Sequence, residues 1–242
     1  MTSERILNHY TFFSFTDLFW ALPGQKRADF YLEWAQDIQE ATSCFHFYQV
    51  SPLQAETDGL LWCALPALNP HDSAAFFDSL GRVLHDRRVY VRPTQALWGY
   101  TRPSTYTRSV RGTPSQEIDP LSSQRAPYLV LYPFVKTIDW YLLGKDTRQG
   151  MMNEHIRVGH QYPEIKQLLL YSFGLQDQEF VVVYETDDLV HFSDLVNELR
   201  STEVRRYTER DTPIFTAIWH TPQEMAALHA PRNSKSSGEE SV

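Results

Sequence analysis

The sequence predicts an α+β fold in which a β-α-β-β-α-β order of elements occurs twice. Apolar, strand-like runs and segments with helical i, i+4 spacing follow one another in the same order in both halves of the chain. An aperiodic segment rich in Ser, Thr, Pro and Arg separates the halves at residues 102–125. The length of 242 residues suits one large domain or two fused small ones.

The first half, residues 1–101, shows its helical pattern most clearly between residues 26 and 41. Phe30, Trp34 and Ile38 recur there at helical spacing and predict one apolar face. In chain order the predicted elements are a strand at 9–19, a helix at 26–41, strands at 44–50 and 60–65 with a turn at 57–59, a helix at 74–85 and a strand at 89–100.

The second half, residues 126–222, repeats this order. Its predicted elements are a strand at 128–135, a helix at 146–166, strands at 168–173 and 179–185 around a turn at 174–177, a helix at 189–207 and a strand at 213–219. Each half therefore has the ferredoxin-like order, and two such sheets can join into one barrel. Residues 102–125 are expected to form an exposed linker loop, and residues 223–242 a disordered tail.

Composition narrows the function classes. The net charge of −8 argues against a nucleic-acid partner, because no basic surplus exists to displace counterions from phosphates. Cys44 and Cys63 are expected to be buried, reduced thiols. No leader and no membrane-spanning run is evident, so we expect a cytoplasmic protein. The aromatic content of 14% fits either an aromatic core or a pocket for a flat ligand.

Among nine histidines, His155 has the most distinctive surroundings. Met151 and Met152 precede it on a predicted helix, and Gly159 follows four residues later. From the residues alone, methionines here are more often core filler than a cofactor wall. His160 diverges from His155 by roughly 140° on a helix, so the two would not share one metal ion. A single histidine is enough to bind an iron that a macrocycle already holds, so the role of an axial iron ligand stays open for His155.

Several segments of the second half occur together in a known family. They are Tyr132-Pro-Phe-Val-Lys136, Asp139-Trp-Tyr141, Met152-Asn-Glu-His155 with Gly159, Phe173-Gly-Leu-Gln-Asp-Gln-Glu-Phe180 and Leu199-Arg-Ser-Thr-Glu203. In this order, with Trp140 fifteen residues before His155, they resemble the haem-binding half of the chlorite dismutase-like superfamily. The resemblance covers about residues 126–220, whereas the first half matches the family only in its order of elements.

The resemblance implies a dimeric α+β barrel in each chain, assembled as a homopentamer, with haem or coproheme bound to the second half. His155 would be the axial iron ligand, and Glu203 would accept a hydrogen bond from its other ring nitrogen. Lys136, Trp140 and Arg200 match positions that line the porphyrin, and the two cations would balance its propionates. From the residues alone, Glu203 would be interpreted as a solvent-exposed charge on a helix.

Two positions separate the branches of the superfamily. Gln167 lies seven residues before Gly174. By the resemblance, it occupies the position at which chlorite dismutases have an arginine on the distal side of the haem. A neutral amide holds an anion less strongly than a guanidinium, so this position favours the coproheme decarboxylase branch. Tyr132 matches the redox-active tyrosine of that branch. The alternatives are an ordinary polar residue at a strand entrance for Gln167 and a packing role for Tyr132.

The reaction implied by the resemblance is oxidative. Iron coproporphyrin III would react with hydrogen peroxide on the Gln167 side, and a Tyr132 radical would take hydrogen from the β-carbon of a propionate. Two such decarboxylations would turn two propionates into vinyl groups and yield haem b. One alternative is a haem enzyme of the same fold that decomposes chlorite or acts as a peroxidase. Another is a ferredoxin-like barrel that binds no porphyrin and acts as a scaffold or sensor.

Overall fold

The computed structural model describes residues 5–103, 106 and 116–230. In chain order its elements are β1 (Arg5–Phe15), α1 (Asp17–Trp20), α2 (Gly24–Ala41), β2 (Cys44–Gln49), β3 (Gly59–Ala67), α3 (Asp72–Asp86), β4 (Val91–Thr101), β5 (Tyr128–Lys136), α4 (Ile138–Leu142), α5 (Lys145–Gly159), β6 (Lys166–Tyr171), β7 (Phe180–Thr186), α6 (Leu189–Arg200), the 3₁₀ turn η1 (Glu203–Tyr207), β8 (Thr208–Arg210), β9 (Phe215–His220) and α7 (Pro222–His229).

The strands of the described residues form one antiparallel sheet in the order β7-β6-β4-β1-β3-β2-β9-β5-β8. β5 also pairs with β7, so the sheet closes on itself and β8 extends it beyond β5. β2 of the first half pairs with β9 of the second, and β4 pairs with β6. The two ferredoxin-like halves therefore join into one α+β barrel, which confirms the predicted fold class.

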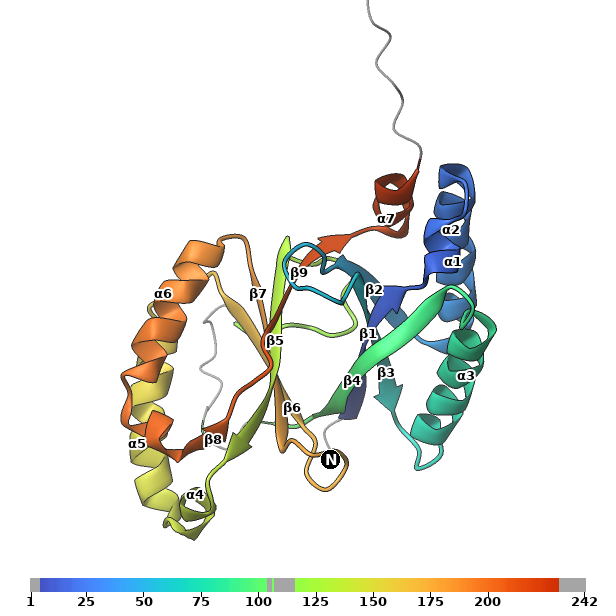
Figure 1. The fold of residues 1–242 in the computed structure, drawn as a ribbon. Helices are drawn as coiled ribbons and strands as arrows, with labels where there is room; N and C mark the ends of the chain where they lie inside the picture. The colour runs from blue at the N-terminus through green and yellow to red at the C-terminus, as the bar shows by residue number, and fades with distance from the viewer. Residues whose placement is uncertain (1–4, 104–105, 107–115, 231–242) are drawn as a thin grey trace, which may run out of the picture.

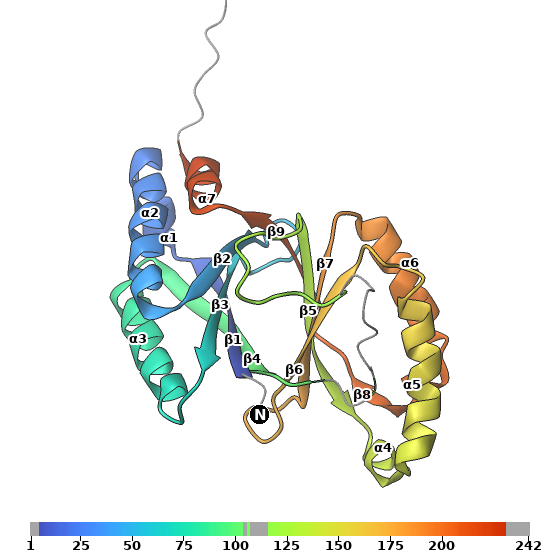
Figure 2. The same cartoon turned by 180° about the vertical axis from the view of Figure 1, so that it is seen from behind.

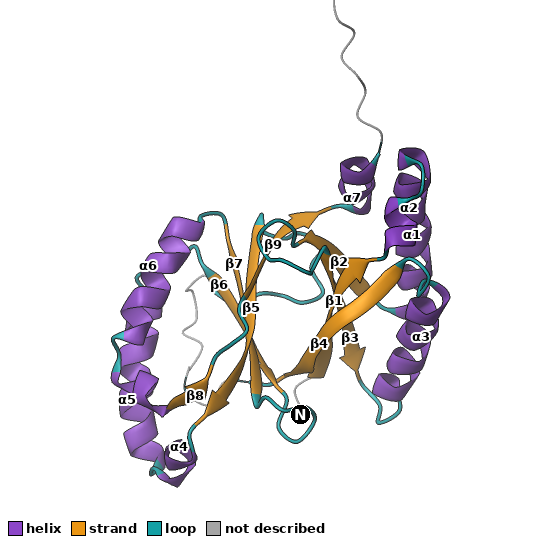
Figure 3. Ribbon diagram, in the orientation of Figure 1, coloured by secondary structure: helices purple, strands orange, loops and turns teal. Residues whose placement is uncertain are grey.

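Side chains of each strand alternate between the barrel interior and the helix-covered outer face. On β5, Leu129 and Leu131 belong to the interior cluster, while Val130 and Tyr132 belong to the cluster beneath the second-half helices. Helices α2 and α3 cover the outer face of the first half, and α5 and α6 cover that of the second (Figures 1 and 3). Seen from behind, the helices again flank the barrel on opposite sides (Figure 2).

Two predicted helices are shorter than expected, for local reasons. The helix predicted at 146–166 ends at Gly159, because Pro163 disfavours helical backbone before it, and β6 begins at Lys166. The helix predicted at 189–207 ends at Arg200, and the separate turn η1 follows it. The short elements α1, α4 and β8 were not predicted.

The prediction of a disordered tail from residue 223 is wrong for its first residues. α7 begins with a capping box in which the Thr221 hydroxyl accepts from the Glu224 amide and the Glu224 carboxylate accepts from Thr221. Met225 and Ala226 are buried in the core cluster that contains α2, and Figure 1 shows α7 beside that helix. Residues 231–242 lie outside the described residues.

The expected exposed loop at 102–125 is also partly buried. Gln116 accepts a backbone hydrogen bond from Gln167, and Ile118 donates one back to it, so this stretch extends the edge of β6. Ile118 is buried in the barrel interior. The Arg125 side chain is 1% exposed and pairs with Glu185 at 3.0 Å. Residues 104–105 and 107–115 of the predicted loop lie outside the described residues.

Two further expectations concern the whole chain. Cys44 and Cys63 are free thiols, Cys63 buried and Cys44 half-buried. Within the described ranges, no helix combines the length and the apolar character needed to span a membrane.

Candidate functional site

Helix α5 covers its sheet differently from the matching helix of the first half. α2 buries six residues against the barrel, among them Phe30, Tyr31 and Trp34. Among the described residues of α5 none is buried, and the helix packs mainly against α6 and η1 (Figure 1). The same position in the repeat thus carries a tightly packed helix in one half and a loosely packed one in the other.

His155 lies on this loosely packed helix. Its Nδ1 is inaccessible to solvent and has no hydrogen-bonding partner among the described residues. Burial, and then the nearby Lys136 ammonium, lower the pKa of His155 to about 4. At neutral pH the imidazole is therefore uncharged and has a lone pair to offer a metal.

The residues that share the His155 face of α5 fit a flat, largely apolar ligand carrying anionic groups. Met152 and Met151 lie three and four residues before His155 and are half-buried. A Cβ added at Gly159, one turn beyond His155, would meet no other atom within 4 Å. Arg148, two turns before His155, has a buried Nε without a hydrogen-bonding partner in the described part of the chain. These features are consistent with a macrocycle against this face.

Lys136 and Trp140 lie where β5 runs into α4. The Lys136 Nζ is 4.4 Å from the centre of the Trp140 ring and 3.4 Å from the Val204 carbonyl oxygen. Both side chains are buried. Burial, and then the positive charge of Arg205, lower the pKa of Lys136 to about 8. Because Lys136 also acts on the His155 pKa, the structure brings these two predicted residues together.

Tyr132 and Gln167 project from the sheet on the side that the second-half helices cover. The register pairs Gln167 with Tyr184 and Tyr184 with Val130, while Tyr132 lies one row further along with Val182. Tyr132 packs against the same cluster as Val158 of α5. The two predicted catalytic residues are therefore on one face of the sheet, the face toward the helix that carries His155.

Tyr132 has charged neighbours. Burial raises its pKa, and among the smaller influences Asp211 raises it further while Arg200 and Arg205 lower it. Asp211 Oδ2 accepts from Arg205 Nη1 at 2.6 Å and from Arg200 Nη2 at 3.4 Å. One carboxylate thus holds two guanidinium groups close to the tyrosine. Tyr132 stays protonated at neutral pH.

The structure does not place the Glu203 carboxylate on His155. Glu203 is exposed, and its carboxylate is 3.4 Å from Arg206 Nε. Its backbone N–H donates to the Glu154 carboxylate at 3.2 Å. The hydrogen bond between Glu203 and the His155 ring therefore stays a prediction.

Reasoning from the sequence missed three residues of this region. Arg148 has a signal in the sequence, because it lies seven residues before His155 and hence on the same helix face. Arg205 and Tyr184 have no such signal. Their contacts with Tyr132 depend on the turn η1 and on the pairing of β5 with β7.

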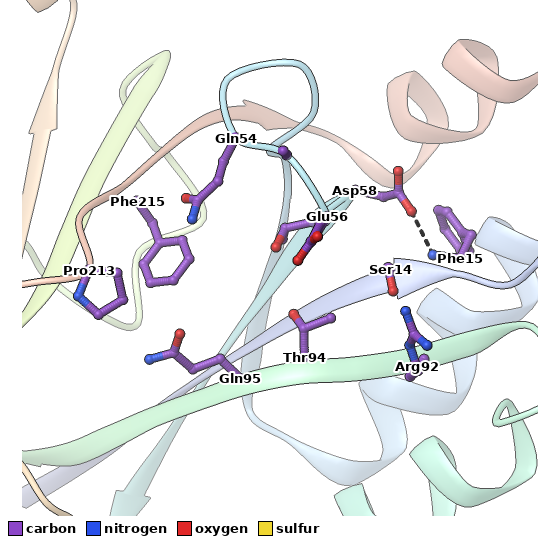
Figure 4. A pocket seen from close by; sticks show the side chains of 12 residues that line it. Ser14, Phe15, Gln54, Glu56, Asp58, Arg92, Thr94, Gln95, Pro213 and Phe215 are labelled. Carbon is purple, nitrogen blue, oxygen red and sulfur yellow. Dashed lines mark hydrogen bonds between the residues drawn. The ribbon is translucent and has the colours of Figure 1, made fainter.

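A separate hollow of about 500 Å³ lies in another part of the barrel (Figure 4). It is lined by residues of β1, β4, the loop before β3 and the start of β9, and by none of the predicted site residues. Buried polar atoms of Ser14 and Gln54 at this hollow have no hydrogen-bonding partner among the described residues.

Known proteins are similar to this chain in fold and over most of its length. A family model described as chlorite dismutase matches residues 24–220. The coproheme decarboxylase of Mycolicibacterium smegmatis is 27% identical over 202 residues, covering 80% of this chain and 82% of that protein. The structure of a variant of the chlorite dismutase from Candidatus Nitrospira defluvii superposes with a TM-score of 0.77 at 22% identity, covering 93% of this chain and 96% of that one. A protein provisionally named a chlorite dismutase gives 0.76 at 25% identity, covering 94% and 99%.

Proposed function

We propose that this chain, which belongs to the chlorite dismutase family, uses hydrogen peroxide to decarboxylate two propionates of iron coproporphyrin III and so produces haem b. The observation that carries the proposal is the half-buried, uncharged His155 imidazole on a loosely packed helix, which covers the sheet face that carries Tyr132 and the neutral Gln167. The similarity to a coproheme decarboxylase supports the choice of substrate.

Binding would use the residues already described around α5. His155 would be the axial iron ligand, and the apolar faces of Met152 and Trp140 would pack against the ring. Coproporphyrin carries four carboxylates, so its site needs several cations. Lys136 and Arg200 would bind propionates, as the family resemblance predicts, and Arg205 would be a further cation beside Tyr132.

The iron porphyrin, once bound, supplies the oxidising equivalents that peroxide delivers. Tyr132 would give up its phenolic hydrogen and then take a hydrogen atom from the β-carbon of the nearest propionate. Loss of one further electron and of carbon dioxide leaves a vinyl group. Each propionate carboxylate thus reacts with one hydrogen peroxide and one proton to give vinyl, carbon dioxide and two water molecules. The part played by the protein is to position the propionate against Tyr132.

Gln167 favours decarboxylation over chlorite decomposition. Its backbone is held by hydrogen bonds to Gln116 and Ile118, so the side chain starts from a fixed point on the sheet. A neutral amide lacks the charge that would hold a chlorite anion. Sustained oxygen release from chlorite would instead assign this chain to the dismutase activity.

The decisive experiment adds hydrogen peroxide to the purified protein loaded with iron coproporphyrin III and follows the porphyrin by mass spectrometry. We expect a three-propionate intermediate and then haem b. Tyr132→Phe should bind the porphyrin and stop its conversion, while Tyr128→Phe, at the other end of β5, should leave it intact. No loss of carbon dioxide from the wild-type complex would overturn the proposal. Assembly as a homopentamer and a cytoplasmic location remain predictions from the sequence, the first testable by native mass spectrometry.

A further inference from the structure

A second tyrosine, Tyr184, lies against Tyr132 on the outer face of the sheet. The centres of the two rings are 6.2 Å apart and their planes are inclined by 30°. Each of the two hydroxyl groups acts on the pKa of the other: Tyr184 lowers that of Tyr132, and Tyr132 raises that of Tyr184. Tyr184 belongs to β7, where it is paired with Gln167 on one side and Val130 on the other. The residue therefore lies between the two predicted catalytic positions.

The surroundings of the two phenols determine which of them would donate in a hydrogen bond between them. Tyr184 is 4% exposed and packs among Val130, Leu195 and the ring of Phe192, 5.2 Å away. Burial and the proximity of Tyr132 raise its pKa well above the ordinary value, so it holds its proton more firmly. Tyr132 is only half-buried and has Arg200 and Arg205 nearby. In a hydrogen bond between the two phenols, Tyr184 would accordingly donate and the Tyr132 oxygen would accept.

We propose that Tyr184 donates a hydrogen bond to Tyr132 and is thereby a positioning residue for the reaction, which fixes the Tyr132 oxygen and turns its O–H bond away from the sheet, toward α5. The inference rests on the proposed function and adds to it a residue that the motifs do not contain. The hydrogen of Tyr132 leaves from the side opposite Tyr184 and is replaced from the propionate on that same side. Tyr184 keeps its own hydrogen throughout.

A purely structural role for Tyr184 would not need its hydroxyl. The ring fills the space beside Phe192 and Val130, and a phenylalanine would fill it equally. The large majority of buried hydroxyl groups in proteins, in contrast, have a hydrogen-bonding partner. The same cluster provides a matched control in Tyr162, whose hydroxyl donates to Glu198 at 2.8 Å. Tyr162→Phe removes a hydroxyl from the same core without altering the pair.

The test combines one measurement on the ligand-free protein with one on the porphyrin complex. Protein labelled with ¹³Cζ-tyrosine, with Tyr132 assigned through Tyr132→Phe, should show the Tyr132 resonance displaced in Tyr184→Phe and unmoved in Tyr162→Phe. With iron coproporphyrin III and peroxide, Tyr184→Phe should retain wild-type porphyrin affinity and decarboxylate ~10-fold to 100-fold more slowly, because misplacing a reacting group costs that much.

An unmoved Tyr132 resonance, or Tyr184→Phe turnover within a factor of about two of wild type, would overturn the inference. If the variant does not fold, the wild-type protein still decides, because a buried Tyr184 hydroxyl proton should show a nuclear Overhauser effect to the Tyr132 ring, and its absence would reject the pair. Failure of the proposed function is a different result. Wild-type protein would then not decarboxylate coproheme at all, whatever the ligand-free spectra show.

Discussion

Lys136 and His155 are coupled through their charges, although one lies at the end of a strand and the other on a helix. After burial, the Lys136 ammonium is the next largest cause of the lowered His155 pKa of about 4. Lys136 itself is held in the protein between the Trp140 ring and the Val204 carbonyl. The pair combines an uncharged imidazole nitrogen with a buried positive charge. That combination suits a ligand with a metal at its centre and carboxylates at its edge.

This coupling gives the first prediction. Lys136→Met should raise the pKa of His155, because it removes the positive charge that disfavours the imidazolium, while burial still keeps that pKa below its ordinary value. Nuclear magnetic resonance titration of the ligand-free protein measures the shift. Lys145→Met removes an exposed lysine at the start of the same helix and serves as the control. An unchanged His155 titration in Lys136→Met would contradict the coupling.

The second prediction concerns acid stability. The pKa values of His9, His46, His155 and His229 are lowered to about 4, with burial as the largest cause for each. Between pH 6.5 and 4 the unfolded chain takes up protons that the folded chain refuses. The free energy of unfolding should therefore fall with decreasing pH, by about 1.4 kcal/mol per pH unit for each such histidine.

Urea unfolding at a series of pH values measures this slope. His155→Ala should reduce the slope between pH 6.5 and 4 by the contribution of one proton, since it removes one of the four groups. A free energy of unfolding that stays level from pH 6.5 to 4 would refute the prediction.

The third prediction addresses recognition of propionates. Arg205→Ala and Arg200→Ala should each weaken binding of iron coproporphyrin III by ~10-fold to 100-fold, the usual effect of losing a hydrogen bond to a charged group. Binding of an iron porphyrin with only two propionates should weaken less. Arg210→Ala, at an exposed position of β8, is the matched control. Equal losses for both porphyrins would show that the arginines act through folding rather than through carboxylates.

The fourth prediction tests the choice between branches. Gln167→Arg should increase the rate of chlorite decomposition and decrease that of coproheme decarboxylation, because a guanidinium on this face of the sheet would hold an oxyanion. The backbone hydrogen bonds of residue 167 do not involve its side chain, so β6 should keep its register. Oxygen release and porphyrin mass are measured on the same preparation. A variant with the wild-type ratio of the two activities would speak against this role.

The sequence predicted the repeated order of strands and long helices, because apolar spacing records which faces are buried. The sequence was misleading where the apolar spacing continued beyond the end of a helix. Tyr162 and Ile165 follow Val158 at helical intervals, yet Pro163 ends the helix and they pack as a turn against the sheet. α7 was missed because the capping box at its start consists of polar residues and because its apolar face is short.

The site was predictable only in part, for a related reason. His155, Lys136, Trp140 and Tyr132 occur in motifs that can be recognised along the chain. Tyr184 could not be found in this way. It meets Tyr132 through the antiparallel register of β5 and β7. A shift of one residue in this register would turn Tyr184 to the opposite face of the sheet.

Binding of the porphyrin iron by His155 is most directly tested by titrating iron coproporphyrin III into His155→Ala and into the control His160→Ala. His160 is an exposed residue five positions after His155. We expect His160→Ala to bind with the wild-type Soret spectrum, and His155→Ala to lose both that spectrum and most of its affinity. Wild-type affinity with an unchanged Soret band in His155→Ala would contradict the account.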